Sequence, residues 1–147
     1  MILLDTNVLV YALNVDSPRH PECLSVIQHA ARGALPGVLV PQVLMECYSV
    51  ITSPRRFAYP TEPDQAWGIM RSLSEAIEVR PVAESLLDDL DGLVSRNSLH
   101  GRDVFDLALV AQMRSHGIRT ICTYNVRDFD VAEIRAVEPA QLLAVYA

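Results

Sequence analysis

Four carboxylate residues stand at positions where an acidic side chain needs an explanation. Asp5 ends a short apolar run, Glu46 lies within an otherwise apolar helical pattern, Asp106 falls in the first turn of a predicted helix, and Asp128 follows a predicted strand. Carboxylates without a histidine or cysteine partner offer hard oxygen ligands, which suit Mg²⁺ or Mn²⁺ rather than zinc or copper. Two such ions roughly 3.5 to 4 Å apart can clamp a phosphodiester and stabilise the attacking and leaving oxygens. If the four acids converge, we expect metal-dependent phosphodiester hydrolysis.

Each acid also has a purely structural interpretation. Asp5 could cap the first helix or sit in a strand-to-helix turn. Asp103 and Asp106 resemble a helix N-cap followed three residues later by an acid that the helix dipole favours, and for Asp103 this interpretation is the stronger one. Glu46 is harder to explain in this way, because a carboxylate on a largely apolar helix is costly to bury unless it is paired or liganded. Asp128 could be a solvated loop acid, so the meeting of the acids in the fold decides between the two interpretations.

The order of the apolar patterns predicts the elements that position these acids. Residues 2–4 form an apolar run without alternation, typical of a strand covered on both faces of a parallel sheet, and Thr6 and Asn7 are good N-cap types for a helix directly after Asp5. Further strands are predicted at 37–40, 77–82 and 118–123, further helices at 17–33, 41–52, 63–76, 83–96 and 103–116, and a proline-rich loop at 52–63. This alternation predicts a three-layer α/β/α fold with a mostly parallel sheet of four to five strands, in which a ligand binds beyond the carboxyl ends of the strands.

Length and composition fit a single domain over residues 1–147. Half of the residues are hydrophobic and 20% are charged, which is typical of one compact core. All twelve basic residues are arginines. The absence of lysine excludes a lysine Schiff base, a P-loop lysine and phosphatases of the haloacid-dehalogenase type, which rely on a lysine that arginine replaces poorly.

The three cysteines and the N-terminus bear on the compartment. Cys23, Cys47 and Cys122 are odd in number and never spaced as a C-x-x-C pair, so neither a disulfide framework nor a zinc site is expected. The N-terminus lacks the basic and long apolar regions of a secretory signal, and the uncharged stretch 33–45 is short and interrupted by prolines. We therefore expect a cytoplasmic protein without a membrane role.

Four stretches carry a family pattern in order along the chain: 4–12 (LDTNVLVYA), 43–46 (VLME), 104–111 (VFDLALVA) and 123–129 (TYNVRDF). Together they resemble the PIN-domain family. Within this family, the size of the chain is similar to that of the VapC toxins of type II toxin–antitoxin systems. The resemblance implies an endoribonuclease dependent on Mg²⁺ or Mn²⁺, with one or two ions per site and hydrolysis by a metal-activated water.

The resemblance also assigns roles to individual residues. It implies Asp5, Glu46 and Asp106 as catalytic metal ligands, and Asp128 falls where the family carries a less regular fourth acid. Three further positions are auxiliary. Thr6 could help to hold the site through its hydroxyl, and Asn125 is a polar side chain near the metals. Asp103, one turn before Asp106, could bind an ion through water or only cap the helix.

The net charge of −6 opposes binding of a polyanion, so local cations are needed. Two divalent ions would offset four carboxylates and bring the charge to about −2. The candidate phosphate contacts are Arg55 and Arg56 in the proline-rich loop, Arg102 beside the start of the acidic helix, and Arg127 beside Asp128.

The resemblance implies partners as well as an RNA substrate: a homodimer, and a VapB-like antitoxin whose tail lies near the active site. Two other interpretations stay open. One is a PIN nuclease of housekeeping RNA processing, which the same acids would serve. The other is a noncatalytic binding module in which the acidic cluster is structural, and in which divalent metal would support no cleavage.

Overall fold

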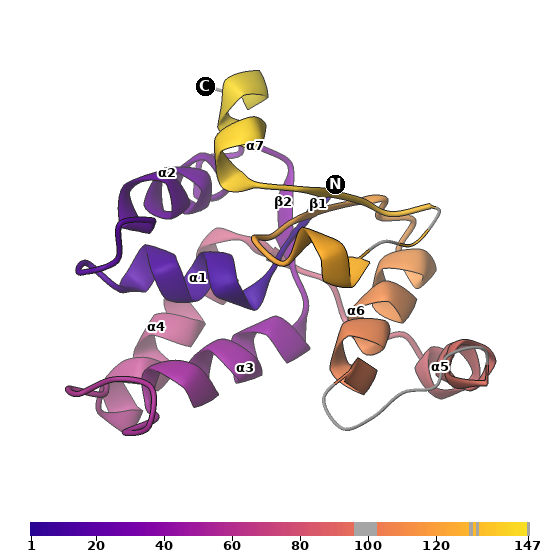
Figure 1. The fold of residues 1–147 in the computed structure, drawn as a ribbon, viewed down its shortest axis with the longest axis horizontal. Helices are drawn as coiled ribbons and strands as arrows, with labels where there is room; N and C mark the ends of the chain where they lie inside the picture. Colours follow the sequence, from indigo (N-terminus) through magenta and orange to yellow (C-terminus); the bar gives the residue numbers. More distant parts are fainter. Residues whose placement is uncertain (96–102, 130, 132, 147) are drawn as a thin grey trace.

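Five parallel strands form one sheet in the part of the chain that the structure describes (Figure 1). The computed structural model describes residues 1–95, 103–129, 131 and 133–146. In the order β3-β2-β1-β4-β5, the strands are β1 (Ile2–Leu4), β2 (Gly37–Leu39), β3 (Glu78–Val79), β4 (Thr120–Cys122) and β5 (Arg135–Val137). The first strand of the chain is therefore the middle strand, paired with β2 on one side and β4 on the other.

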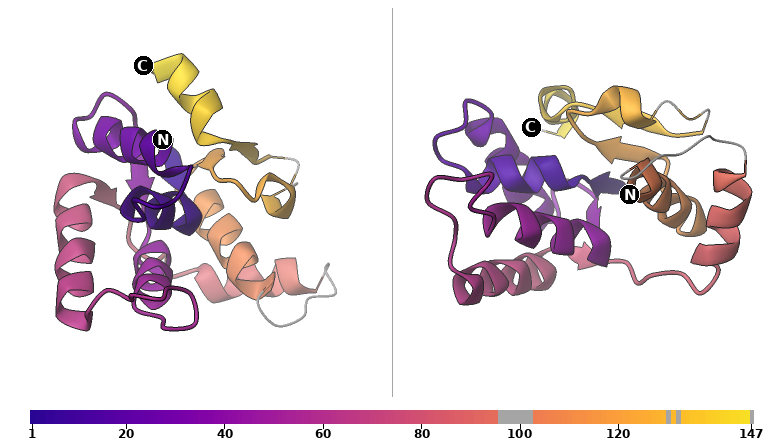
Figure 2. Two further views of the ribbon diagram at one scale, coloured as in Figure 1. Left: turned by 60° about the vertical axis from the view of Figure 1, so that its left-hand side comes forward. Right: turned by 60° about the horizontal axis from the view of Figure 1, so that its bottom comes forward.

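The helices surround this sheet in a three-layer α/β/α arrangement, as the sequence predicted. They are α1 (Thr6–Leu13), α2 (His20–Ala31), α3 (Pro41–Ile51), α4 (Pro63–Ala76), α5 (Leu86–Val94), α6 (Asp103–Ser115), the 3-10 helix η1 (Val126–Phe129) and α7 (Pro139–Tyr146). Helix α1 packs against α2 and α3, and α5 packs against α6. Figures 1 and 2 show α1 to α4 gathered on one side of the molecule, with α5 and α6 on the other.

The buried middle of the sheet explains why β1 has no polar residue. Leu3 and Leu4 are fully buried, as a strand covered on both faces requires, and the apolar positions of α3 that face inward are Val43, Cys47 and Ile51. Helices α2 and α6 are each followed by a glycine in the left-handed region, Gly33 at φ 70° and Gly117 at φ 65°. Both helices thus end where the sequence predicted.

Some element boundaries differ from the prediction. Helix α2 begins at His20 rather than at Ser17, because the Ser17 side chain accepts a hydrogen bond from the backbone N–H of Arg19 at 3.2 Å and holds a turn there instead. Strand β3 covers only Glu78–Val79 of the predicted 77–82. Strand β5 and helix α7 were not predicted, and Asp128 lies in the 3-10 helix η1 rather than in a loop.

Candidate active site

Asp5 stands at the carboxyl end of the middle strand and caps the next helix. Its Oδ1 accepts the backbone N–H of Thr6 at 2.7 Å, so the cap of α1 is Asp5 and not Thr6 or Asn7. Its Oδ2 accepts the Asn7 side-chain amide at 2.6 Å and the Thr123 hydroxyl, from the end of β4, also at 2.6 Å. The residue is only 6% exposed, and burial raises the pKa of its carboxyl, against the lowering effect of these hydrogen bonds and with a smaller rise from the charge of Glu46.

Glu46 is the half-buried acid of α3, and both of its carboxylate oxygens are occupied. Oε2 accepts the hydroxyl of Thr6 at 3.0 Å, and Oε1 accepts the side-chain amide of Gln42 at 2.8 Å. Gln42 lies one helical turn before Glu46 and also donates to the backbone carbonyl of Phe105 in α6 at 2.9 Å. These contacts supply the partners that a carboxylate on an apolar helix requires.

Asp106 lies in the first turn of α6, and the charges of the other acids of the cluster raise its pKa. Its pKa is raised from 3.8 to about 6, first by burial and then by Asp128, Asp5, Glu46 and Asp103, in that order. The four charges that act on it come from the end of β1, from α3, from η1 and from its own helix. The fold therefore concentrates negative charge at the carboxyl edge of the sheet.

A cleft of about 420 Å³ opens beside these acids. Three acids, the Thr6 side chain and one arginine line it together with polar and apolar neighbours: Asp5, Thr6, Asn7, Val10, Tyr11, Asn14, Glu46, Val50, Arg56, Phe57, Asp106 and Asn125. Three of the four predicted ligands thus meet in one cleft beyond the strand ends, where a parallel sheet binds its ligand.

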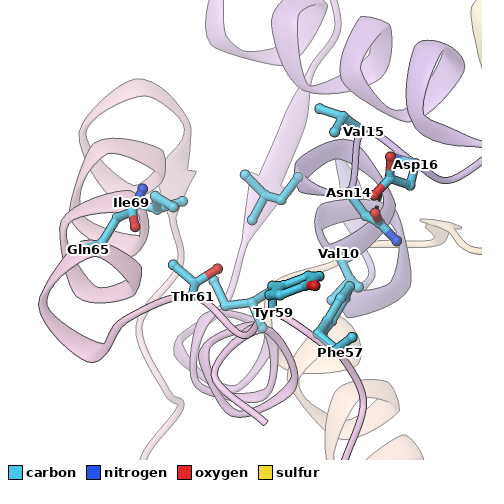
Figure 3. A pocket seen from close by; sticks show the side chains of 12 residues that line it. Val10, Asn14, Val15, Asp16, Phe57, Tyr59, Thr61, Gln65 and Ile69 are labelled. Atoms are coloured by element: carbon cyan, nitrogen blue, oxygen red, sulfur yellow. Dashed lines mark hydrogen bonds between the residues drawn. The ribbon is translucent and has the colours of Figure 1, made fainter. Parts of the chain in front are cut away.

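A second hollow of about 330 Å³ adjoins the cleft and shares Val10, Asn14 and Phe57 with it. Figure 3 shows its side chains, with Phe57 and Tyr59 facing Val10 and Asn14 across the opening. Asp16 is the one acid among its lining residues. Without converging carboxylates, this hollow does not have the chemistry that the sequence predicted, and we place the candidate site in the acidic cleft.

The remaining predicted residues are distributed around the cleft. Asn125 and Arg56 line it, and Arg55 is exposed next to Arg56 in the loop that follows α3. Arg127 is exposed in η1 and borders a different, shallow depression with Phe129 and Ile134. Arg102 lies outside the described residues.

The two further acids differ from the three that line the cleft. Asp103 is exposed and is the first residue of α6, and Asp128 is exposed in η1. Both lie near enough to Asp106 for their charges to raise its pKa.

The donor set fits a hard divalent cation in its chemistry. Asp5, Glu46 and Asp106 supply only carboxylate oxygens, and their mutual repulsion favours a cation between them. In the part of the chain that the structure describes, no three acidic, thiol or imidazole side chains lie close enough to hold one ion directly. The reason is visible in the hydrogen bonds, since Asp5 and Glu46 turn their oxygens toward Thr123, Thr6 and Gln42. Mg²⁺ commonly keeps several waters and takes one or two carboxylates, so the set suits an ion held partly through water.

Sequence reasoning missed two glutamines that belong to the site. Gln112 on α6 is 1% exposed and donates its side-chain amide to Gln42 Oε1 at 3.0 Å, and Gln42 in turn binds Glu46. The signal was present in the sequence, because Gln112 interrupts an apolar helical face and a buried amide needs partners. The role of the Thr123 hydroxyl was missed as well, although Thr123 is the last residue of the predicted strand.

Comparison with known proteins identifies the family of this fold and site. The family model described as "PIN domain" matches residues 2–134. The chain belongs to the PIN-domain family. Ribonuclease VapC24 of Mycobacterium tuberculosis is 27% identical to this PIN protein over 134 residues, which cover 88% of this chain and 89% of the relative. Ribonuclease VapC43 of the same species is 32% identical over 114 residues, covering 76% and 77%.

Solved structures of PIN proteins share the fold. Mycobacterium tuberculosis VapC20, described as a toxin that cleaves the sarcin-ricin loop, superposes with a TM-score of 0.67 at 18% identity over 91% of this chain and 97% of its own. VapBC2 from Rickettsia felis, bound to a promoter DNA fragment, superposes with a TM-score of 0.66 at 15% identity, covering 94% and 98%. Among the described residues, no helix has the length and apolar character needed to cross a membrane.

Proposed function

We propose that this PIN protein is an endoribonuclease that depends on Mg²⁺ or Mn²⁺ and hydrolyses RNA phosphodiester bonds, and that it is the toxin of a VapBC-type toxin–antitoxin pair. The observation that carries the proposal is the meeting of Asp5, Glu46 and Asp106 in one cleft at the carboxyl edge of the sheet. The names of the relatives support RNA as the substrate, since both of the Mycobacterium tuberculosis relatives are ribonucleases.

In this proposal Asp5, Glu46 and Asp106 hold one or two ions, and Asp128 adds negative charge behind them. A bound Mg²⁺ or Mn²⁺ supplies a Lewis acid that stabilises charge on the phosphate oxygens and activates a water for attack. Thr123 and Asn7 fix the carboxylate of Asp5, while Thr6 and Gln42 fix that of Glu46. These hydrogen bonds restrict the positions of the two carboxylates before substrate binds.

Polar and cationic residues of the cleft then orient the substrate. Asn125 presents an amide that can donate to a phosphate oxygen, and Arg56 presents a guanidinium that can bind a phosphate with two parallel hydrogen bonds. Arg55, Arg102 and Arg127 remain further candidates for phosphate contacts. Asp103 is a candidate for contact with an ion through water.

The partners follow from the same family. Solved structures of the same fold include a toxin–antitoxin complex from Klebsiella pneumoniae and VapBC-1 from nontypeable Haemophilus influenzae. We extend this to the present chain and propose a VapB-like antitoxin and a homodimer, with residues 1–147 acting as one nuclease domain in the cytoplasm.

The test is cleavage of total RNA by the purified chain, freed of any copurified partner, with and without Mg²⁺ or Mn²⁺. We expect discrete fragments that need the metal and that disappear with Asp5→Asn. Asp91→Asn is the matched control, since it makes the same chemical change at an exposed position on α5 and should cleave like the parent.

Two results would redirect the proposal. Cleavage confined to precursor transcripts, together with no growth arrest on expression, would favour a housekeeping nuclease. No cleavage with either metal, combined with no metal binding by calorimetry, would leave a noncatalytic binding module with a structural acidic cluster.

A further inference from the structure

Arg19 lies over the ring of Tyr124 and close to the ring of Tyr11, beside the acidic cleft. Its guanidinium carbon lies 3.9 Å from the ring centroid of Tyr124 and 5.0 Å from that of Tyr11. The two tyrosine rings contact each other edge to face, with centroids 5.5 Å apart. A guanidinium stacked in this way gains cation–π attraction and loses much of its rotational freedom.

Within the described residues, no ion pair joins the guanidinium of Arg19 to an acid. The ion pairs among the described residues are Arg71–Glu75, Arg80–Glu78 and Arg114–Glu133, and none of them involves Arg19. Glu22, one helical turn further on, instead accepts the hydroxyl of Tyr124. Arg19 is exposed although its guanidinium lies over the Tyr124 ring, so its N–H donors can reach an anion.

The position of Arg19 connects it to the cleft. Tyr11 lines the cleft, and Tyr124 directly precedes Asn125, which lines it too. The backbone N–H of Tyr124 donates to Asn7 Oδ1 at 3.2 Å, and Asn7 binds Asp5. Arg19 directly precedes α2, and Arg56 lies in the loop after α3. Figure 1 shows α2 and α3 on opposite sides of α1.

We propose that Arg19 binds a backbone phosphate of the RNA strand in the cleft, next to the phosphate that reacts. The inference rests on the proposed function and adds to it a phosphate site outside the carboxylates. A chain with a net charge of −6 needs such fixed cations, since phosphate contacts supply most of the affinity for a nucleic acid. The fork of a stacked arginine matches two phosphate oxygens.

The experiment measures binding rather than cleavage. All variants carry Asp5→Asn so that RNA stays intact, and the probe is a fluorescein-labelled single-stranded RNA oligonucleotide of mixed sequence. Its affinity is measured against KCl concentration at constant Mg²⁺. Arg19→Ala should weaken binding about tenfold and should reduce the slope of log affinity against log salt by about 0.7, the value for one phosphate contact on a single strand.

Two variants separate charge from structure. Arg19→Lys keeps the cation, so it should keep most of the slope while binding more weakly. Arg32→Ala is the matched control, because it removes an exposed arginine at the far end of the same helix, roughly 20 Å away at 1.5 Å per residue. It should bind like the parent.

Each outcome has a distinct meaning. An Arg19→Ala variant with an unchanged salt slope would overturn the inference, and a fall in melting temperature without a change in slope would show that Arg19 only supports the tyrosine pair. If the Asp5→Asn parent does not bind the RNA at all, while unmutated chain does not cleave it, the proposed function fails and this inference fails with it.

Discussion

The hydroxyl of Thr6 donates a hydrogen bond to Glu46 Oε2 at 3.0 Å, and so joins two residues 40 positions apart. Thr6 is the first residue of α1, directly after Asp5, and Glu46 lies on α3. The contact fixes the spacing between the acid of β1 and the acid of α3. Gln42 holds the other oxygen of Glu46, so that the carboxylate is oriented from two sides.

Replacing Thr6 should therefore slow the reaction without unfolding the chain. We expect Thr6→Val to reduce kcat for RNA cleavage about 10- to 100-fold, the usual cost of losing a group that orients a metal ligand. Thr6→Ser keeps the hydroxyl and should retain nearly full activity. A loss in Thr6→Ser as large as that in Thr6→Val would contradict the role of the hydroxyl, because serine keeps it, and circular dichroism checks that both variants remain folded.

The acidic cluster should make the metal-free chain less stable as the pH rises. The pKa of Asp106 is about 6 in the folded chain against an ordinary 3.8, so between these values the folded state binds more protons than the unfolded state. The free energy of unfolding must then fall from about pH 4 to about pH 6 on account of this group. Urea denaturation in EDTA across this range should show a smaller fall for Asp106→Asn.

Addition of Mg²⁺ provides the complementary measurement at pH 7. An ion that binds only the folded state raises the melting temperature, and the rise grows with the ratio of the free ion concentration to its Kd. We expect this rise in the parent and a smaller one in Asp106→Asn. A rise of the same size in both proteins would argue against Asp106 as a ligand.

The rate at which Cys47 and Cys122 are alkylated should show whether the core around them stays closed. Burial raises the pKa of Cys47 and of Cys122 to about 12 from an ordinary 9.0. At pH 8 about one in ten thiols with the ordinary pKa is a thiolate, whereas only about one in ten thousand of these buried thiols is. Only the thiolate reacts readily. We expect iodoacetamide to modify these cysteines rapidly in urea and very slowly in the native chain, as mass spectrometry would show. Rapid native labelling would mean that α3 or β4 opens frequently.

Gly37 should be intolerant of even a methyl group. A Cβ at this position would lie 2.7 Å from the Cβ of Ala30 and 3.1 Å from a methyl group of Leu35. We expect Gly37→Ala to cost about 1–3 kcal/mol in the free energy of unfolding, measured by urea denaturation.

Gly68 is the matched control for this substitution. It lies within α4, where an added Cβ meets nothing within 4 Å. Because alanine is the better helix former, Gly68→Ala should be neutral or stabilise the chain by up to about 1 kcal/mol. Similar destabilisation by both substitutions would contradict the close approach of α2 to β2.

The apolar patterns of the sequence predicted most of the fold because its central elements are strongly patterned. Strand β1 is fully apolar, and α3 has buried residues at helical spacing, so both were predicted close to their observed bounds. Strand β3 spans two residues and β5 begins with the exposed Arg135, so neither forms a buried apolar run like that of β1. Their place is set by pairing with β2 and β4, and pairing between distant segments leaves no local pattern.

The site was predictable only in part, for a related reason. The acids Asp5, Glu46 and Asp106 could be proposed from residue types and from family resemblance, and the fold brings all three to one cleft. Gln42 and Gln112 act through contacts between α3 and α6, which the sequence does not specify. The stacking of Arg19 likewise depends on Tyr124, more than 100 residues away along the chain.

The place of β1 in the middle of the sheet has a consequence for the order of assembly during translation. Strand β1 leaves the ribosome long before β4, and it gains this neighbour only after residue 122 has been made, with Asp106 emerging shortly before. Contacts over such long separations form late, because the loop between them must close first. The acidic cleft is therefore completed only after β4 has been made, and until then the nascent chain carries an unfinished set of acids beside ribosomal RNA.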